Sequence, residues 1–335
     1  MYNSPKSTCA THADSWYTGN GYRLGQELSG WLAAVKPTEE QEFEPPIAGC
    51  KAIIGPHAGY SYSGRAAAWA YKTIDTTGIK RVFILGPSHH VYLTRCDVSG
   101  CDYYETPLGK LSIDKEVNDE LLQTGKFKTM SLDTDEDEHS IEMHLPYIYH
   151  VFQDNITVVP ILVGAIDRAQ EIDYGRILAP YLADPENFFV ISSDFCHWGT
   201  RFRYTFYYPE PLPSEIAGVR LRSSGPQQYN FSQRPIYASI SDLDHEATDI
   251  LTIRPTPEVE TPAAQSHKKF SDYLDRTGNT ICGRHPIGVL LGALMELEKH
   301  GKHPKVEWVH YEQSSKCQNL RDSSVSYASA YVSFL

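Results

Sequence analysis

The stretch KAIIGPHAGY (residues 51–60) joins a short apolar run to a Gly-Pro step and a histidine. A short apolar run of this kind, bounded by glycine and proline, is typical of a buried strand. Proline ends the strand because it has no N–H to donate. The stretch therefore predicts a strand over 51–55 and places His57 on the turn that follows it.

Two further stretches repeat this arrangement. In RVFILGPSHH (residues 81–90) an apolar run leads into His89, and a third run over 188–192 leads into Asp194 and His197. In open α/β sheets, groups just past the carboxyl ends of the strands line the ligand crevice. The three histidines are therefore expected to meet at one edge of a sheet.

The rest of the chain also alternates between strand and helix patterns. Further strands are predicted over 156–163, 306–311 and 324–332, and helices over 64–73, 114–124 and 286–299. Strands alternating with helices predict an α/β fold, a central sheet flanked by helices. The C-terminal run alternates like an antiparallel strand, so the sheet is predicted to be mixed.

One domain is expected over residues 1–335. Two stretches, 209–235 and 252–266, are rich in Pro, Ser, Gln and Gly or in Pro and polar residues, and we interpret them as surface insertions or loops.

Composition excludes some classes of function. A net charge of −12 and the lack of any basic run argue against nucleic acid as a partner. No apolar stretch is long enough to span a bilayer, so membrane insertion is not expected. We see no signal peptide, so the seven cysteines are interpreted as free thiols in a reducing compartment, the cytoplasm, with the nucleus as a second location.

A cysteine completes the candidate site. Cys282 lies directly before the helix predicted over 286–299, where a helix N-terminus is expected to lower the pKa of a thiol. His57, His89 and Cys282 together would suit a borderline or soft metal ion. Alternatively, Cys282 is the nucleophile of a thiol hydrolase, paired with a nearby histidine.

Other residues near the predicted site are candidates for supporting roles. Asp194 and His197 suit a carboxylate that orients a turn and a histidine that moves protons, or else simple loop hydrogen bonding and packing. The acidic run 133–138 is interpreted as a solvated loop that leads into a helix. His139 or Glu142 is a further candidate for the wall of the pocket.

Several long strings are similar to those of one known family. They are HADSWY (12–17), PHAGY (56–60), LGPSHH (85–90), TDEDEHSIEMHLP (134–146) and the stretches 192–204 and 279–291. These strings resemble the Memo family, named for mediating receptor-driven cell motility. The resemblance runs from about residue 10 to the C-terminus, and the stretches near 209–235 and 252–266 look longer than the family pattern.

The resemblance implies the fold of class III extradiol dioxygenases, which hold Fe(II) with two histidines and a carboxylate and use a further histidine as acid and base. By position, the two ligands are His57 and His89, and Cys282 stands where the carboxylate would be. His197 matches the acid/base histidine, with Asp194 beside it. A thiolate favours copper, zinc or redox-active iron, and its own oxidation beside activated oxygen argues against ring cleavage.

Two classes of function follow from the resemblance. In the first, the protein binds copper or iron and acts as a redox protein on oxygen or a small molecule, with a role in signalling, motility and redox or metal homeostasis. In the second, the cleft is a vestigial active site that binds phosphotyrosine-containing peptides or signalling proteins. The negative net charge disfavours the second class, because phosphate recognition uses Arg clusters. Both stay open at this point.

Overall fold

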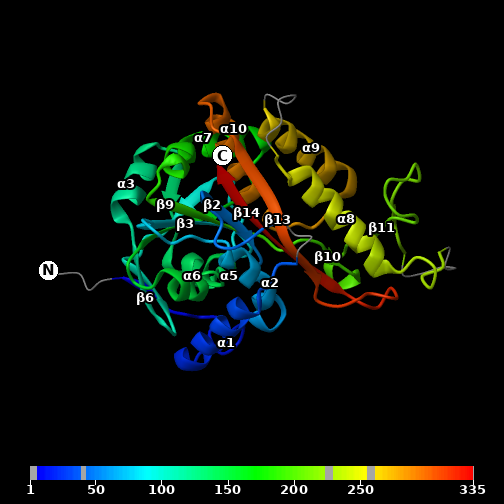
Figure 1. Ribbon diagram of the computed structural model, residues 1–335, viewed down its shortest axis with the longest axis horizontal. Coiled ribbons are helices and arrows are strands. Elements are labelled where there is room, and N and C mark those ends of the chain that lie inside the picture. The colour runs from blue at the N-terminus through cyan, green and yellow to red at the C-terminus, as the bar shows by residue number, and fades with distance from the viewer. Residues whose placement is uncertain (1–5, 39–42, 223–228, 255–260, 335) are drawn as a thin grey trace.

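A computed structural model describes residues 6–38, 43–222, 229–254 and 261–334. In these residues, 12 strands pair into one sheet. The strands are β1 (Ser7–Thr8), β2 (Cys50–Gly55), β3 (Arg81–Pro87), β4 (Cys96–Val98), β5 (Tyr103–Thr106), β6 (Gly109–Ile113), β7 (Phe127–Thr129), β8 (Thr157–Val163), β9 (Asn187–Ser192), β10 (His197–Trp198), β13 (Pro304–Gln313) and β14 (Ser324–Phe334). Figure 1 shows this sheet in the middle of the molecule.

The sheet is mixed, as predicted. Its main path runs β1-β5-β6-β8-β3-β9-β2-β14-β10, and β13 pairs with β14. The four central strands, β8, β3, β9 and β2, are parallel, while β14 is antiparallel to β2 and to β13. All six predicted strands are present. Because β2, β3 and β9 run in the same direction, their carboxyl ends lie at one edge of the sheet.

Both faces of the central strands are buried. Side chains alternate between the two faces of a strand, and here neighbouring residues enter different core clusters. Ile54 and Phe83 pack into one cluster, whereas Ile53 and Ile84 pack into the other. This explains why the central strands are apolar runs rather than alternating patterns.

Helices cover both faces (Figure 1). The helices are α1 (Gly21–Ala34), α2 (Tyr60–Lys72), α3 (Lys115–Gln123), α4 (Leu132–Asp137), α5 (His139–Glu142), α6 (Leu145–Phe152), α7 (Arg168–Ala183), α8 (Ile236–Leu251), α9 (Pro262–Thr277) and α10 (Arg284–Lys299). Residues of α1, α2 and α6 form one core cluster with the sheet, and residues of α7, α8, α9 and α10 belong to the other. The described residues therefore form one α/β domain, as predicted.

Helices α7 and α10 approach each other closely at paired glycines. A Cβ on Gly175 would lie 2.6 Å from the Cα of Gly292, so neither position has room for a side chain. This contact brings α10 onto the sheet and fixes where its first turn, with Pro286, begins.

The stretches interpreted as insertions fall partly outside the described residues, at 223–228 and 255–260. The two-residue strands β11 (Phe206–Tyr207) and β12 (Val219–Arg220) form a separate small sheet here. The loop prediction is wrong for 262–266, which open α9 and bury Ala263 and Ser266 against the core. None of the helices in the described part of the chain is both long and apolar enough to cross a bilayer.

Candidate metal centre

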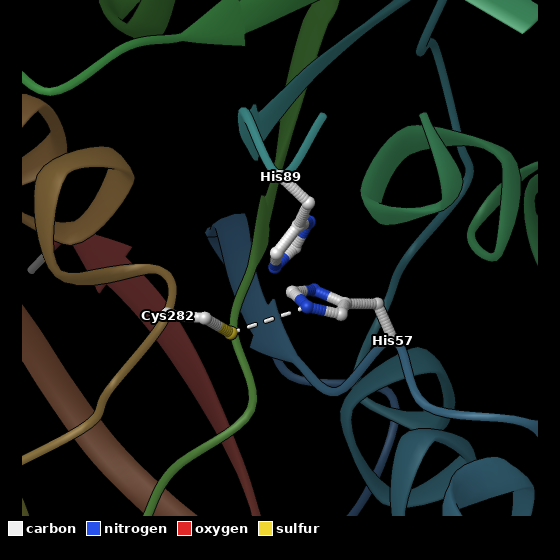
Figure 2. Close-up of side chains that lie close together, drawn as sticks. All are labelled: His57, His89 and Cys282. Atoms are coloured by element: carbon white, nitrogen blue, oxygen red, sulfur yellow. Dashed lines mark hydrogen bonds between the residues drawn. The ribbon is translucent and has the colours of Figure 1, made fainter. Parts of the chain in front are cut away.

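Three chain segments bring His57, His89 and Cys282 together. His57 follows β2, His89 follows β3, and Cys282 lies just before α10. One ligand atom from each residue lies within 4.8 Å of the other two. Figure 2 shows the three side chains converging from separate elements. The prediction that parallel strand ends deliver these histidines to one place agrees with this geometry.

The tautomer of His57 follows from its contacts. Its side chain is buried, and Nδ1 lies 2.6 Å from the Oγ of Ser192. That Oγ donates its own proton to the carbonyl of Ser140 at 2.7 Å, so it accepts a proton from His57 Nδ1. The free lone pair of His57 is therefore on Nε2, which lies 3.2 Å from the Cys282 sulfur.

Ser192 also accepts from a second buried imidazole. The Nε2 of His144 lies 3.0 Å from the same Oγ. Burial lowers the pKa of His57 well below its usual value and that of His144 to about 3, so both rings are neutral. Sequence reasoning missed the roles of Ser192 and His144, because nothing local links residues 57, 144 and 192.

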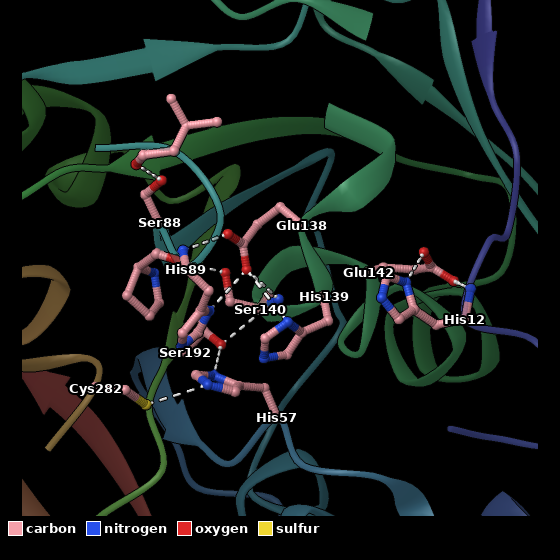
Figure 3. A network of polar contacts seen from close by, with 12 residues as sticks. His12, His57, Ser88, His89, Glu138, His139, Ser140, Glu142, Ser192 and Cys282 are labelled. Carbon is pink, nitrogen blue, oxygen red and sulfur yellow. Dashed lines mark hydrogen bonds and ion pairs between the residues drawn. The ribbon is translucent and has the colours of Figure 1, made fainter. Parts of the chain in front are cut away.

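His89 is oriented by a buried carboxylate, Glu138. Its backbone N–H donates to Oε2 at 2.7 Å and its Nδ1 to Oε1 at 2.8 Å, which leaves Nε2 for a metal ion (Figure 3). Burial alone would raise the pKa of Glu138, but the hydrogen bonds and charge of His89 lower it to about 2. A carboxylate behind a histidine ligand fixes its tautomer and orientation. The interpretation of 133–138 as a solvated loop is thus wrong: residues 133–137 lie in α4, and Asp135 and Glu138 are buried.

The expected pKa shift of Cys282 is also wrong in direction. Burial, followed by the negative charge of Asp194, raises the pKa of this thiol well above its ordinary value. The sulfur accepts the Asp194 N–H at 3.2 Å, which only partly offsets this effect. Desolvation of the thiolate therefore outweighs the effect of the helix N-terminus here.

Asp194 and His197 lie in the same cleft. The carboxylate of Asp194 accepts the backbone N–H of His57 at 2.9 Å, and burial raises its pKa to about 7. His197 lies in β10, and its Nδ1 contacts the carbonyls of Phe195 and Thr280 at 2.9 and 3.1 Å. Burial lowers the pKa of His197, so its ring is neutral. Because Nδ1 donates to a carbonyl oxygen, the lone pair is on Nε2. Asp194 therefore holds the turn at His57, and His197 has the protonation state of a base.

The remaining candidates lie around this centre. His139 lines the cleft and stacks on His89, with ring centroids 4.2 Å apart. Glu142 lies behind it, where it accepts from Tyr17 at 2.6 Å and from His12 at 2.7 Å. His90 is exposed and belongs to neither of the potential ligand groups found among the described residues.

His57 and His89 line an open cleft of about 630 Å³, whereas Cys282 is not among its lining residues. Aromatic and hydroxyl side chains form its walls, and Arg201 is the cation that lines it. The cleft residues are Ser15, Trp16, His57, Ala58, Gly59, Ser61, Tyr62, His89, His139, Asp194, His197, Arg201, Phe202, Ser314, Ser315, Ser323, Ser324, Val325 and Tyr327.

The donor set fits a transition-metal ion. Two imidazoles have Nδ1 engaged in a hydrogen bond, which leaves Nε2 of each for an ion, and a thiol lies beside them. Imidazole and thiolate suit copper, zinc and iron better than calcium or magnesium, which prefer oxygen ligands. A second potential group, His89, Glu138 and His139, shares His89. Because Glu138 already accepts both N–H groups of His89, its role here is support.

Comparisons with known proteins agree with the sequence resemblance. The family model described as Memo-like protein matches residues 9–331. Protein MEMO1 of Homo sapiens is 47% identical over 322 residues, and Protein MEMO1 of Danio rerio is 48% identical over 322 residues; each match covers 95% of both chains. Among solved structures, an uncharacterized protein from Escherichia coli K12 matches 83% of this chain and 99% of its own, with 13% identity and a TM-score of 0.45.

Proposed function

Because this chain belongs to the Memo-like protein family, we propose that it binds copper or iron, with zinc as a third candidate, and acts as a redox protein. The ligands in this proposal are His57, His89 and Cys282. The observation that carries it is the donor set: three ligand atoms within 4.8 Å, with the second nitrogen of each imidazole already hydrogen-bonded. Cell signalling and motility, with redox or metal homeostasis, are the proposed cellular setting.

A bound copper or iron ion would supply one-electron chemistry at the cleft. His57 is ready to bind, because its neutral ring presents a lone pair on Nε2, and the hydrogen bond from Nδ1 of His89 to Glu138 leaves the Nε2 of His89 for the ion. Cys282 must lose its proton first, so binding releases a proton and weakens as the pH falls. His197 is placed to accept or return a proton, and Asp194 keeps His57 on its turn.

Peptide binding in the same cleft is the second proposal, and Arg201 favours it. Its guanidinium stacks over Phe202 at 4.5 Å and forms no ion pair with a carboxylate in the described part of the chain. Trp16 and Tyr62 lie in the same cleft and are 37% and 60% exposed. An unpaired cation beside aromatic side chains suits a phosphotyrosine-containing peptide.

The thiol-hydrolase alternative has less support. A nucleophilic cysteine needs a lowered pKa or a base that removes its proton. Burial instead raises the pKa of Cys282, and the neighbouring His57 is itself neutral with a strongly lowered pKa. A metal ion supplies the positive charge that a thiolate needs at this position.

The metal proposal is tested by elemental mass spectrometry of untagged protein. Wild type is compared with Cys282→Ala and His57→Ala, and with Cys9→Ser as a control that removes an exposed thiol. We expect near-stoichiometric metal in wild type and control, and its loss in both ligand variants. A wild type that holds no metal and takes up no copper, iron or zinc on titration contradicts the proposal.

The two roles of the cleft separate in further variants. His197→Ala should keep the metal and lose any turnover, because His197 moves protons and does not ligate. Arg201→Ala should weaken binding of a phosphotyrosine peptide while metal content stays unchanged. Peptide affinity that survives metal removal would favour the recognition role over the redox role.

A further inference from the structure

A hydrogen-bond chain leads from the metal centre into the core. His57 Nδ1 and His144 Nε2 both donate to the Oγ of Ser192, at 2.6 and 3.0 Å. Because the proton of His144 is on Nε2, its Nδ1 is an acceptor, and the Tyr71 hydroxyl donates to it at 2.9 Å. His144 and Tyr71 are almost completely buried. The hydroxyl of Tyr71 is thus connected to a metal ligand by two intervening side chains.

A row of neighbouring aromatic rings, of which the first two are stacked and the others tilted or edge-on, continues from Tyr71 toward the surface. The rings of Tyr71 and Tyr147 are stacked with centroids 4.6 Å apart and an interplanar angle of 12°. Tyr60 follows at 5.6 Å from Tyr147, and Trp31 at 5.8 Å from Tyr60. Trp31 is half-buried on α1, so this row of rings connects the buried end of the hydrogen-bond chain with the molecular surface.

Tyr71 differs from the next two tyrosines, Tyr147 and Tyr60, in the hydrogen-bond acceptor of its hydroxyl. Tyr147 donates to the carbonyl of Gly64 and Tyr60 to the carbonyl of Met143, each at 2.7 Å, and a carbonyl does not take up a proton. Tyr71 donates to an imidazole nitrogen, which does. Burial also raises the pKa of Tyr71, so its phenol stays protonated and must pass on its proton when it loses an electron.

We propose that Tyr71 is a redox-active residue that supplies an electron to the metal centre while its phenolic proton moves to His144. The inference rests on the proposed metal-dependent redox function. It assigns a role to two buried side chains, one on α2 and one directly before α6, that neither bind the ion nor line the cleft.

The reaction balances with hydrogen peroxide as the oxidant. Hydrogen peroxide takes up two electrons and two solvent protons and becomes two molecules of water. One electron comes from the reduced ion and one from Tyr71, which becomes a neutral tyrosyl radical as its proton moves to Nδ1 of His144. An electron from Trp31, passed along Tyr60 and Tyr147, restores Tyr71; the proton then returns from His144, and Trp31 releases its indole proton to water.

Electron donation by Tyr71 would protect the Cys282 thiolate from oxidation. Cys282 is the most oxidisable ligand of the centre, and a cysteine beside an activated oxidant proceeds to sulfinic and sulfonic acids that are not reversed. If Tyr71 supplies the second electron, Cys282 is not the group that is oxidised. This predicts that loss of the Tyr71 hydroxyl increases damage at Cys282.

The experiment uses protein loaded with copper(I) or iron(II) without oxygen, with metal content measured before each run. Tyr71→Phe keeps the ring and its stack but removes the hydroxyl, and His144→Gln keeps Tyr71 but removes the base. Tyr207→Phe is the matched control, because the Tyr207 ring is buried outside the cleft lining and its hydroxyl donates to the carbonyl of Arg234. Each sample is mixed with hydrogen peroxide, frozen for electron paramagnetic resonance, and digested for mass spectrometry of Cys282.

We expect a tyrosyl radical signal in wild type and Tyr207→Phe that ring-deuterated tyrosine narrows. In Tyr71→Phe and His144→Gln the signal should fall several-fold, and irreversible oxidation of Cys282 should rise several-fold. Equal radical yield and equal Cys282 oxidation in all metal-loaded variants would overturn the role of Tyr71. A wild type without metal would instead count against the proposed function itself, so the two failures are distinguishable.

Discussion

Replacing Glu138 by Gln tests how the metal centre is preorganised. The Glu138 carboxylate accepts the backbone N–H and the Nδ1–H of His89, and a third hydrogen bond from the N–H of Ser140 at 2.9 Å. A glutamine amide keeps the shape but offers one oxygen, so its NH2 group faces a donor. His89 then loses the partner that holds its ring and keeps the proton on Nδ1.

The magnitude follows from the position of Glu138 directly behind a ligand. Loss of such a hydrogen-bond partner typically weakens metal binding by about 10- to 100-fold. This corresponds to about 1.4–2.8 kcal/mol of binding free energy. The pKa of Glu138 is about 2, so its carboxylate is ionised across the neutral range, and the loss should not depend on pH there.

The assay is a competition titration of copper(I) or zinc(II) against a chelator of known affinity. Glu298→Gln is the control: this carboxylate, near the far end of α10, also accepts a backbone N–H, at 2.9 Å. We expect control and wild type to agree within twofold. Unchanged affinity in Glu138→Gln, with the ion still bound by His89, would refute the argument that the carboxylate orients the ligand.

Three further predictions concern stability. Ser192→Ala leaves the N–H groups of His57 and His144 without their acceptor, so urea unfolding should show a loss of about 1–3 kcal/mol for each donor, and an unchanged midpoint would contradict this. Gly283→Ala places a Cβ 2.4 Å from the carbonyl oxygen of Ser192 and should lower the melting temperature, whereas Gly30→Ala, which meets nothing within 4 Å, should raise it or leave it unchanged. Burial lowers the pKa of His144 from 6.5 to about 3, so below pH 6.5 the unfolded chain binds a proton that the folded chain does not. The free energy of unfolding should therefore fall by about 1 kcal/mol over the first pH unit below 6.5, and His144→Gln should lose this part of the pH dependence.

Local sequence determined the strands and where they deliver their histidines. The runs that became β2 and β3 are short, apolar and closed by Gly-Pro, and each is followed by a histidine. These features act within a few residues, so they could be interpreted without knowledge of the fold. The rule that groups beyond parallel strand ends share a crevice then placed His57 and His89 together.

Local patterns also grouped these histidines with Cys282, and the resemblance added that Cys282 stands where a carboxylate ligand would be. The residue pattern favoured a metal ligand and kept a nucleophile as the alternative role for that thiol. The position of α10, which begins just after Cys282, depends on contacts between distant parts of the chain, such as the close packing of α10 on α7 at Gly175 and Gly292.

Only the tertiary structure decided which groups support the ligands and how they are charged. Glu138 is 49 residues from His89, and Ser192 is 135 residues from His57, so no sequence period connects them. The helix N-terminus predicted a lowered pKa for Cys282, but burial reversed its direction. Electrostatics inside a protein depends on how much water remains around a group, and that quantity exists only once the whole chain has packed.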